Sequence, residues 1–329
     1  MPRIAASALV IQLATTALLA GGAAASDGVL ELNHACATTT GCVSGDAPGY
    51  PITLDGAAGR SYRLTSDLRV PMATHGIVIG HSGTTLDLGG FTIAQACTWP
   101  SPGGGTQFCL RNGEGDGIRT TSNVAIEGVQ VRHGTVHFMG GKGVFLGPES
   151  IVDSVVVRES GDDGIYVGTA SVVTDCIVEE NDGWGVFGGG TLTRSTARGN
   201  TTGLHWQGTI SHNQVSQSAI YGIQASSGSV ITHNSVTSSD TAGINCNRDC
   251  RIADNAVRSS GTGSTDYGIE CRGGCSVSDN MVQGSGGWGI KLWDPEASYR
   301  GNTVSDSGVG SIDGGFDLGH NACDGALCP

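Results

Sequence analysis

Charged side chains stand directly before the first members of a series of recurring glycines. Asp116, Lys142 and Asp163 each precede a Gly-aliphatic pair, at intervals of 26 and 21 residues. Two carboxylates beside a bound sugar could protonate a glycosidic oxygen and activate water, as glycoside hydrolysis requires. The lysine could instead abstract a proton next to a uronate carboxylate, as a lyase requires, with help from Arg119 and Tyr166. A simple ladder of surface ion pairs is the competing interpretation.

Aromatic side chains recur two positions after the same glycines. Side chains alternate along a strand, so the residue directly after each glycine points inward and these rings point outward. Three outward rings in successive segments would form an apolar strip against which sugar rings could lie. The competing interpretation is that the rings only cover the sheet. The predicted sugar-binding residues are this strip, the next member of its column and two aromatic residues that directly precede glycines: Phe145, Tyr166, Phe187, His205, Trp184 and Tyr221.

The elements that must position these side chains are short strands in a repeat of about twenty residues. A glycine followed by an aliphatic residue recurs from Gly117 to Gly289 at intervals of 18 to 26 residues. A unit this short cannot bury its own apolar face, so it must stack on its neighbours as the coil of a solenoid. We expect one buried stack that contains Ile118, Val144, Ile165, Val186, Leu204, Ile223, Ile244, Ile269 and Ile290.

An asparagine follows the second apolar cluster of many units. Buried amides need partners, and identical amides in stacked coils supply them, so we predict a ladder inside a turn. The residues just before the ladder could ligate a metal, but exposed turn positions are the favoured interpretation because no supporting residues are visible. The predicted ladder contains Asn213, Asn234, Asn255, Asn280 and Asn302, and the column before it contains His212, His233, Asp254 and Asp279.

The repeats "DDGIYVGTASVVTDCIVEEN" and "YGIQASSGSVITHNSVTSS" resemble the pectate-lyase-like superfamily of right-handed parallel β-helix proteins. The segment "SYRLTSDLRV…GIVIGHSGTTLDLGGFTI" is similar to the opening coils of that group. The resemblance covers about residues 50–305. It implies an all-β fold with a single right-handed parallel β-helix between two caps. It does not select an activity, because the superfamily includes lyases, hydrolases, epimerases, adhesins and proteins of no known activity.

The chain begins with the pattern of a secretory signal. Arg3 precedes an apolar run at 4–20, which small residues follow. No later segment approaches the roughly 20 apolar residues of a membrane span. We therefore expect an exported protein that is secreted, periplasmic or on the cell surface. The predicted organisation is a signal peptide at 1–25, an N-terminal cap with first strands at 26–75, the helix at 76–305 with an excursion loop at 94–113, and a C-terminal cap at 306–329.

Eleven cysteines in an exported chain predict disulfides. Cys176 has no close partner and is expected to be a buried free thiol. Cys246, Cys250, Cys271 and Cys275 occupy equivalent places in adjacent coils; they could bridge within each coil or between coils, and bound zinc is the less favoured alternative. The expected close pairs are Cys36/Cys42, Cys97/Cys109, Cys246/Cys250, Cys271/Cys275 and Cys323/Cys328.

The formal net charge of −13 disfavours nucleic acid and anionic membranes as partners. It also disfavours a polyanionic substrate, unless a local basic patch or bound cations offset the charge. We predict an exported carbohydrate-active protein that binds a polysaccharide along the aromatic face; if it is an enzyme, it is a polysaccharide lyase or a glycoside hydrolase. The alternative is a non-catalytic, structural or adhesin-like protein. No cofactor or metal is predicted, and the sequence indicates neither a calcium requirement nor an oligomeric state.

Overall fold

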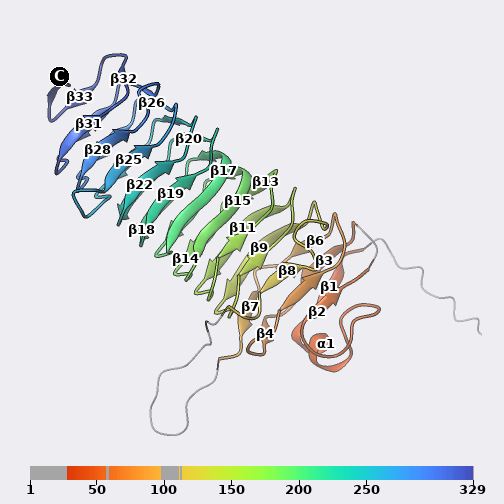
Figure 1. Ribbon diagram of the computed structural model, residues 1–329. Coiled ribbons are helices and arrows are strands. Elements are labelled where there is room, and N and C mark those ends of the chain that lie inside the picture. The colour runs from red at the N-terminus through yellow and green to blue at the C-terminus, as the bar shows by residue number, and fades with distance from the viewer. Residues whose placement is uncertain (1–27, 57–58, 98–110, 112, 329) are drawn as a thin grey trace, which may run out of the picture.

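The computed structural model describes residues 28–56, 59–97, 111 and 113–328. These residues form one right-handed parallel β-helix of about 12 turns (Figure 1). Each full turn contributes strand residues to three columns, and four long strands bend from one column into the next. The predicted signal peptide and most of the predicted excursion loop, including Cys109, lie outside the described residues. Among the described strands, all pairings are parallel except that of the C-terminal hairpin β33–β34.

The first column carries the residues singled out in the sequence and is called the site column. Its strands are β2 (Ile52–Leu54), β5 (Ile77–Ile79), β8 (Ile118–Thr120), β10 (Val144–Phe145), β12 (Ile165–Tyr166), the first parts of β15 (Trp184–Thr193) and β17 (Thr202–Ser211), then β19 (Tyr221–Ala225), β22 (Ala242–Cys246), β25 (Tyr267–Cys271), β28 (Trp288–Leu292) and β31 (Gly310–Asp313).

The second column follows the site column within each turn. Its strands are β1 (Leu30–Leu32), β3 (Ser61–Leu64), β6 (Thr85–Asp87), the first parts of β9 (Gln130–His137) and β11 (Ile151–Arg158), β13 (Ser171–Thr174), the second parts of β15 and β17, β20 (Val230–Thr232), β23 (Arg251–Ala253), β26 (Ser276–Ser278), β29 (Ser298–Arg300) and β32 (Phe316–Asp317).

The third column closes each turn. Its strands are β4 (Leu68–Val70), β7 (Thr92–Gln95), the second parts of β9 and β11, β14 (Ile177–Glu179), β16 (Thr196–Arg198), β18 (Gln214–Ser218), β21 (Ser235–Ser239), β24 (Ala256–Arg258), β27 (Met281–Gln283), β30 (Thr303–Ser305) and β33 (Ala322–Cys323), against which β34 (Ala326–Leu327) folds back.

The predicted aliphatic stack forms the inner face of the site column. All nine predicted members are 0 % exposed, and each pairs with the next across hydrogen-bonded strands. Ile77 and Ile52 extend the stack toward the N-terminus. This part of the prediction is confirmed. Strands β2 to β4 and β31 to β33, which lie in the ranges predicted as caps, stack in the same three columns.

The recurring glycines are explained by a close approach inside the coil. A Cβ added at Gly222 would lie 2.3 Å from Val236 Cγ1 and 2.6 Å from the carbonyl oxygen of Gly243. Real Cβ atoms essentially never approach heavy atoms below 3.0 Å. Because glycine has no Cβ, the valine of the third column and the backbone of the next coil can both pack directly against its Cα. The same approach recurs at most of the glycines that precede a buried aliphatic residue: Gly117, Gly143, Gly164, Gly203, Gly243, Gly268 and Gly289.

The predicted asparagine ladder is present in the turn before the third column. Asn234 Oδ1 accepts hydrogen bonds from the backbone N–H and the Nδ2 of Asn213, both at 3.0 Å, and Asn255 accepts the same pair from Asn234. The pattern continues through Asn280, Asn302 and Asn321. The column before the ladder is exposed with φ between 57° and 58°, as turn positions require: His212, His233, Asp254 and Asp279.

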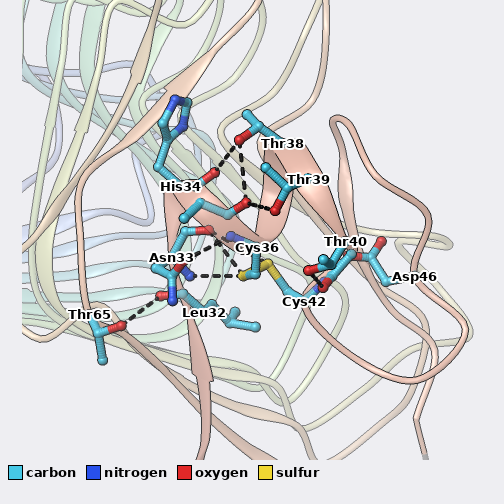
Figure 2. The surroundings of a disulfide bond; sticks show 12 residues. Leu32, Asn33, His34, Cys36, Thr38, Thr39, Thr40, Cys42, Asp46 and Thr65 are labelled. Carbon is cyan, nitrogen blue, oxygen red and sulfur yellow. Dashed lines mark hydrogen bonds between the residues drawn. A yellow bond between two sulfur atoms is a disulfide. The ribbon is translucent and has the colours of Figure 1, made fainter.

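A short helix, α1 (His34–Thr39), lies at the N-terminal end of the β-helix (Figure 1). Asn33 caps it, since its Oδ1 accepts the Cys36 N–H at 2.9 Å. The disulfide between Cys36 and Cys42 closes the loop after α1 (Figure 2). A hydrogen bond from the His34 N–H to Ser66 Oγ at 2.8 Å joins the start of α1 to the turn between β3 and β4.

The described disulfides follow the predicted close pairs: Cys36–Cys42, Cys246–Cys250, Cys271–Cys275 and Cys323–Cys328. The second and third of these bridge within their own coil, which decides between the two predicted connectivities. Cys176 is a buried free thiol, as expected, and burial raises its pKa to about 12. In the described part of the chain, no helix is long and apolar enough to cross a membrane.

The aliphatic stack predicts the outcome of an Ile223→Asp substitution. A carboxylate without a partner in this fully buried position costs several kcal/mol, so we expect little folded protein. Ile223→Ala should fold, with a loss of about 2–5 kcal/mol. Secretion yield and circular-dichroism melting measure both effects. Gln224→Asp on the outward side of the same strand is the control and should melt close to wild type; equal melting of both Asp variants would contradict the assigned stack.

Candidate functional site

The outward side chains of the site column lie in the register predicted from the glycines. Strand pairing aligns each member with the next along the helix. The N-terminal half of the column is mainly aromatic and the C-terminal half is polar. The described column from β8 to β31 consists of Arg119, Phe145, Tyr166, Phe187, His205, Gln224, Asn245, Glu270, Lys291 and Asp313.

The aromatic rings form one continuous strip. The Tyr166 ring contacts Phe145 edge-on at a centroid distance of 5.0 Å and stacks on Phe187 at 4.6 Å. Trp184, from the position before the glycine, also stacks on Phe187, at 4.5 Å. All four side chains are half-buried, so the strip keeps an accessible surface while each ring is held by its neighbours. Such a strip is a rigid apolar platform.

Two cations extend over the N-terminal end of this strip. The Arg119 guanidinium lies 5.4 Å from the centroid of Phe145, and Lys142 Nζ lies 5.4 Å from that of Tyr166. The structure therefore brings together all five residues predicted as catalytic, with Asp116 3.2 Å from Arg119 and Asp163 bound to Lys142. Their convergence around the first aromatic rings follows from the register of β8, β10 and β12.

The two predicted carboxylates are buried, whereas the sequence suggested an exposed patch. Asp116 is 7 % exposed and Asp163 is 2 % exposed. Each accepts a backbone hydrogen bond from the next coil: Asp116 Oδ1 from the Lys142 N–H at 2.8 Å, and Asp163 Oδ1 from the Trp184 N–H at 2.9 Å. A carboxylate that satisfies a backbone donor must approach the chain closely. These side chains therefore fasten one coil to the next.

Lys142 completes this cluster by bridging two carboxylates. Its Nζ donates to Asp162 Oδ2 at 2.7 Å and to Asp163 Oδ2. Burial alone would lower the pKa of Lys142, but the hydrogen bonds to the two carboxylates outweigh it and raise that pKa. Burial raises the pKa of Asp163, and the Lys142 ammonium opposes this shift. The ammonium is therefore held in its charged form.

His205 lies where the aromatic strip ends. Its ring meets Trp184 at 5.1 Å and Phe187 at 4.9 Å, both edge-on. Burial lowers the pKa of His205, and the charge of Asp163 only partly offsets this shift, so the imidazole is neutral at pH 7. Its Nδ1 is buried and has no hydrogen-bond partner among the described residues. This nitrogen is closed off from solvent, so the part of His205 that a ligand could meet is the ring surface that lines neighbouring cavities.

Two cavities of about 180 Å³ each meet at His205. One is lined by Tyr166, Phe187 and the backbone of Gly188 and Gly189. The other is polar. Its wall contains His205, Tyr221, Gln224, Asn245, Asn247 and Arg272. Tyr221, which was predicted to bind sugar together with the aromatic strip, thus lines the polar cavity and is not one of the stacked rings.

The C-terminal part of the column contains a second charged cluster, which is centred on Glu270. Glu270 is 3 % exposed, although its register position is outward. It accepts hydrogen bonds from Asn245 Nδ2, from Arg272 Nε at 3.2 Å and from the Trp293 indole Nε1 at 3.0 Å. Trp293 lies outside the Gly-aliphatic register, so the repeat gave no signal for it.

Metal ligation has one geometric candidate in the part of the chain that the structure describes. Cys246, Cys271 and Cys275 offer sulfur atoms within 4.8 Å of one another. Each of these cysteines is in a disulfide, which removes the thiolate that zinc binds. The predicted catalytic and sugar-binding residues do not form such a group.

The buried Lys142–Asp163 pair predicts a stability effect. Lys142→Met leaves the Asp163 carboxylate buried without its cation, and we expect a loss of about 3–5 kcal/mol in the free energy of unfolding. Asp162→Asn, which alters the 42 %-exposed partner of the same lysine, should cost under about 1 kcal/mol. Urea unfolding followed by fluorescence measures both. A Lys142→Met protein as stable as wild type would show that the pair does not fasten the coils.

Comparisons with known proteins identify the fold. No protein family and no curated protein matches the sequence. The structure is similar to a double mutant of the periplasmic alginate epimerase AlgG, with a TM-score of 0.63 and 12 % identity over 82 % of this chain and 75 % of that one.

Two further solved structures are similar. The A-module of Azotobacter vinelandii mannuronan C-5 epimerase AlgE4 gives a TM-score of 0.59 at 15 % identity over 88 % of both chains. The catalytic domain of a GH87 α-1,3-glucanase with nigerose gives 0.54 at 12 % identity, over 82 % of this chain and 62 % of that one. With the strand pairing described above, these likenesses show that the chain has a right-handed parallel β-helix fold.

Proposed function

We propose that this protein binds a polysaccharide along the outward face of the site column. The observation that carries the proposal is the unbroken strip of ring contacts that leads into two cavities at His205. Sugar rings have C–H faces that pack on aromatic rings, and hydroxyls that hydrogen-bond to amides. Along this face the aromatic rings come first and the amide side chains of Gln224 and Asn245 follow them. The three similar structures are named for polysaccharides or bind a sugar, which supports a carbohydrate ligand.

The charges on this face favour an uncharged polysaccharide. Among the described residues of the face, each basic side chain already contacts a carboxylate. A uronate carboxylate would have to displace one of these contacts, and the formal net charge of −13 opposes its approach. The pairs are Arg119 with Asp116, Lys142 with Asp162 and Asp163, Arg272 with Glu270, and Lys291 with Asp313.

Cleavage is a second candidate function, and it is favoured by the position of His205 at the two cavities. The charged cluster is the weaker candidate for this role. Lys142 is held protonated and Asp163 is engaged with two partners, which makes the charged cluster a poor source of a proton acceptor. His205 is better placed, because its imidazole is neutral and it lines both cavities. Hydrolysis fits an uncharged ligand better than a lyase reaction, which requires a uronate carboxylate to activate the neighbouring proton.

Binding is tested with immobilised neutral and uronic-acid polysaccharides, with and without calcium. Tyr166→Ala and Phe187→Ala should each weaken binding of the retained neutral polysaccharide by about tenfold, since a central aromatic side chain contributes about 1–2 kcal/mol. Phe316→Ala is the matched control, because this ring is 63 % exposed in β32 of the second column. Retention of no polysaccharide, or equal retention by all three variants, would refute the proposed face.

Cleavage is tested by measuring new reducing ends in the same panel. We expect His205→Ala to abolish any turnover while binding is weakened less than by Phe187→Ala. Because burial lowers the pKa of His205, the rate should hold as the pH falls through the ordinary histidine range and decline only below it. Full turnover by His205→Ala would exclude this residue, and loss of turnover in Asp163→Asn at unchanged stability would return the assignment to the charged cluster.

A further inference from the structure

An exposed tryptophan projects just beyond the end of β28. Trp293 is 54 % exposed, yet its indole is fixed by polar neighbours. Its Nε1 donates to Glu270 Oε1 at 3.0 Å, and Lys291 Nζ lies 4.4 Å from the ring centroid. Tyr267 approaches the ring edge-on at 6.3 Å. A large ring that is exposed and also held in one orientation is arranged for contact with another molecule.

The group that fixes the indole is itself immobile. Glu270 is 3 % exposed and accepts further hydrogen bonds from Asn245 and Arg272. A buried carboxylate with three donors keeps one geometry, because loss of any donor would leave a buried charge undersatisfied. The indole orientation is therefore set before any ligand arrives. Preorganised aromatic side chains bind with a smaller loss of conformational entropy.

Trp293 continues the face that carries the proposed binding strip. Arg272 and Asn245, which hold Glu270, also line the polar cavity that contains His205 and Tyr221. From Phe187 in β15 to Lys291 in β28 the column advances by five coil steps. At roughly 4.8 Å for each step, the rings of Phe187 and Trp293 are separated by about 24 Å along the helix. An extended glycan of several sugars spans that length.

We propose that Trp293 is a remote subsite that stacks one uncharged sugar ring of the polysaccharide bound by the aromatic strip. The inference rests on the proposed function and adds a second anchoring point to it. An uncharged sugar is specified because Lys291 is paired with Asp313 and Arg272 with Glu270, so the subsite supplies no spare positive charge. Two anchors on one rigid face make affinity depend on ligand length, since only a long ligand engages both.

The test uses oligosaccharides of graded length prepared from the neutral polysaccharide that the protein retains, with calorimetry on the full-length protein. Trp293→Ala should weaken binding of oligosaccharides longer than about 24 Å by roughly tenfold and leave shorter ones unchanged. Trp293→Phe keeps a stacking ring without the Glu270 bond and should recover part of the loss. Phe187→Ala is the comparison variant and should weaken binding at every length.

The outcomes separate this inference from the proposed function. If Trp293→Ala binds long oligosaccharides as tightly as wild type, the subsite is wrong while the aromatic strip stands. An equal loss at all lengths, accompanied by a lower melting temperature, would assign Trp293 to structure and also overturn the subsite. If wild-type protein binds no oligosaccharide of any length, the proposed function and the subsite fail together. A loss confined to long oligosaccharides supports the subsite, even where the melting temperature falls because Glu270 has lost a donor.

Discussion

The stacking of one coil on the next in a fixed register is the constraint on which this molecule depends. A coil has too few aliphatic side chains to bury them by itself, so each is buried between neighbouring coils, as Ile223 is between Leu204 and Ile244. Because strand side chains alternate, fixing the inward residue fixes the outward one. The aromatic strip is therefore a consequence of core packing: Tyr166 meets Phe187 because Ile165 lies on Val186.

Buried polar groups strengthen the same stacking, and this explains why several chemically suggestive residues are poor candidates for catalysis. The Asp116 and Asp163 carboxylates each accept a backbone N–H of the following coil, so their charges serve the backbone. His205 differs in that its neutral imidazole lines two cavities. On this face, a side chain that is open to a cavity is available to a ligand, whereas a cluster of charges indicates attachment between coils.

How much could be predicted from the sequence depended on whether a feature repeats. The Gly-aliphatic interval predicted the buried stack, the outward register and therefore the contact of Phe145, Tyr166 and Phe187. It could not predict that Asp163 is buried, because that depends on a backbone N–H of the next coil. Trp293 escaped notice for a related reason: its role arises from a hydrogen bond to Glu270 across 23 residues, and Trp293 lies outside the Gly-aliphatic register.

The asparagine ladder has a direction. Each amide oxygen receives hydrogens from the coil before it and each amide nitrogen gives them to the coil after it, so the side-chain dipoles align head to tail and polarise one another. The series needs a terminal acceptor, and the Asp317 carboxylate provides one by accepting from Asn321 Nδ2 at 2.6 Å. The two ends of the solenoid are thus electrically different. A coil grafted onto the C-terminal end would have to supply an acceptor of its own, whereas one grafted at the start of the ladder would have to supply a donor.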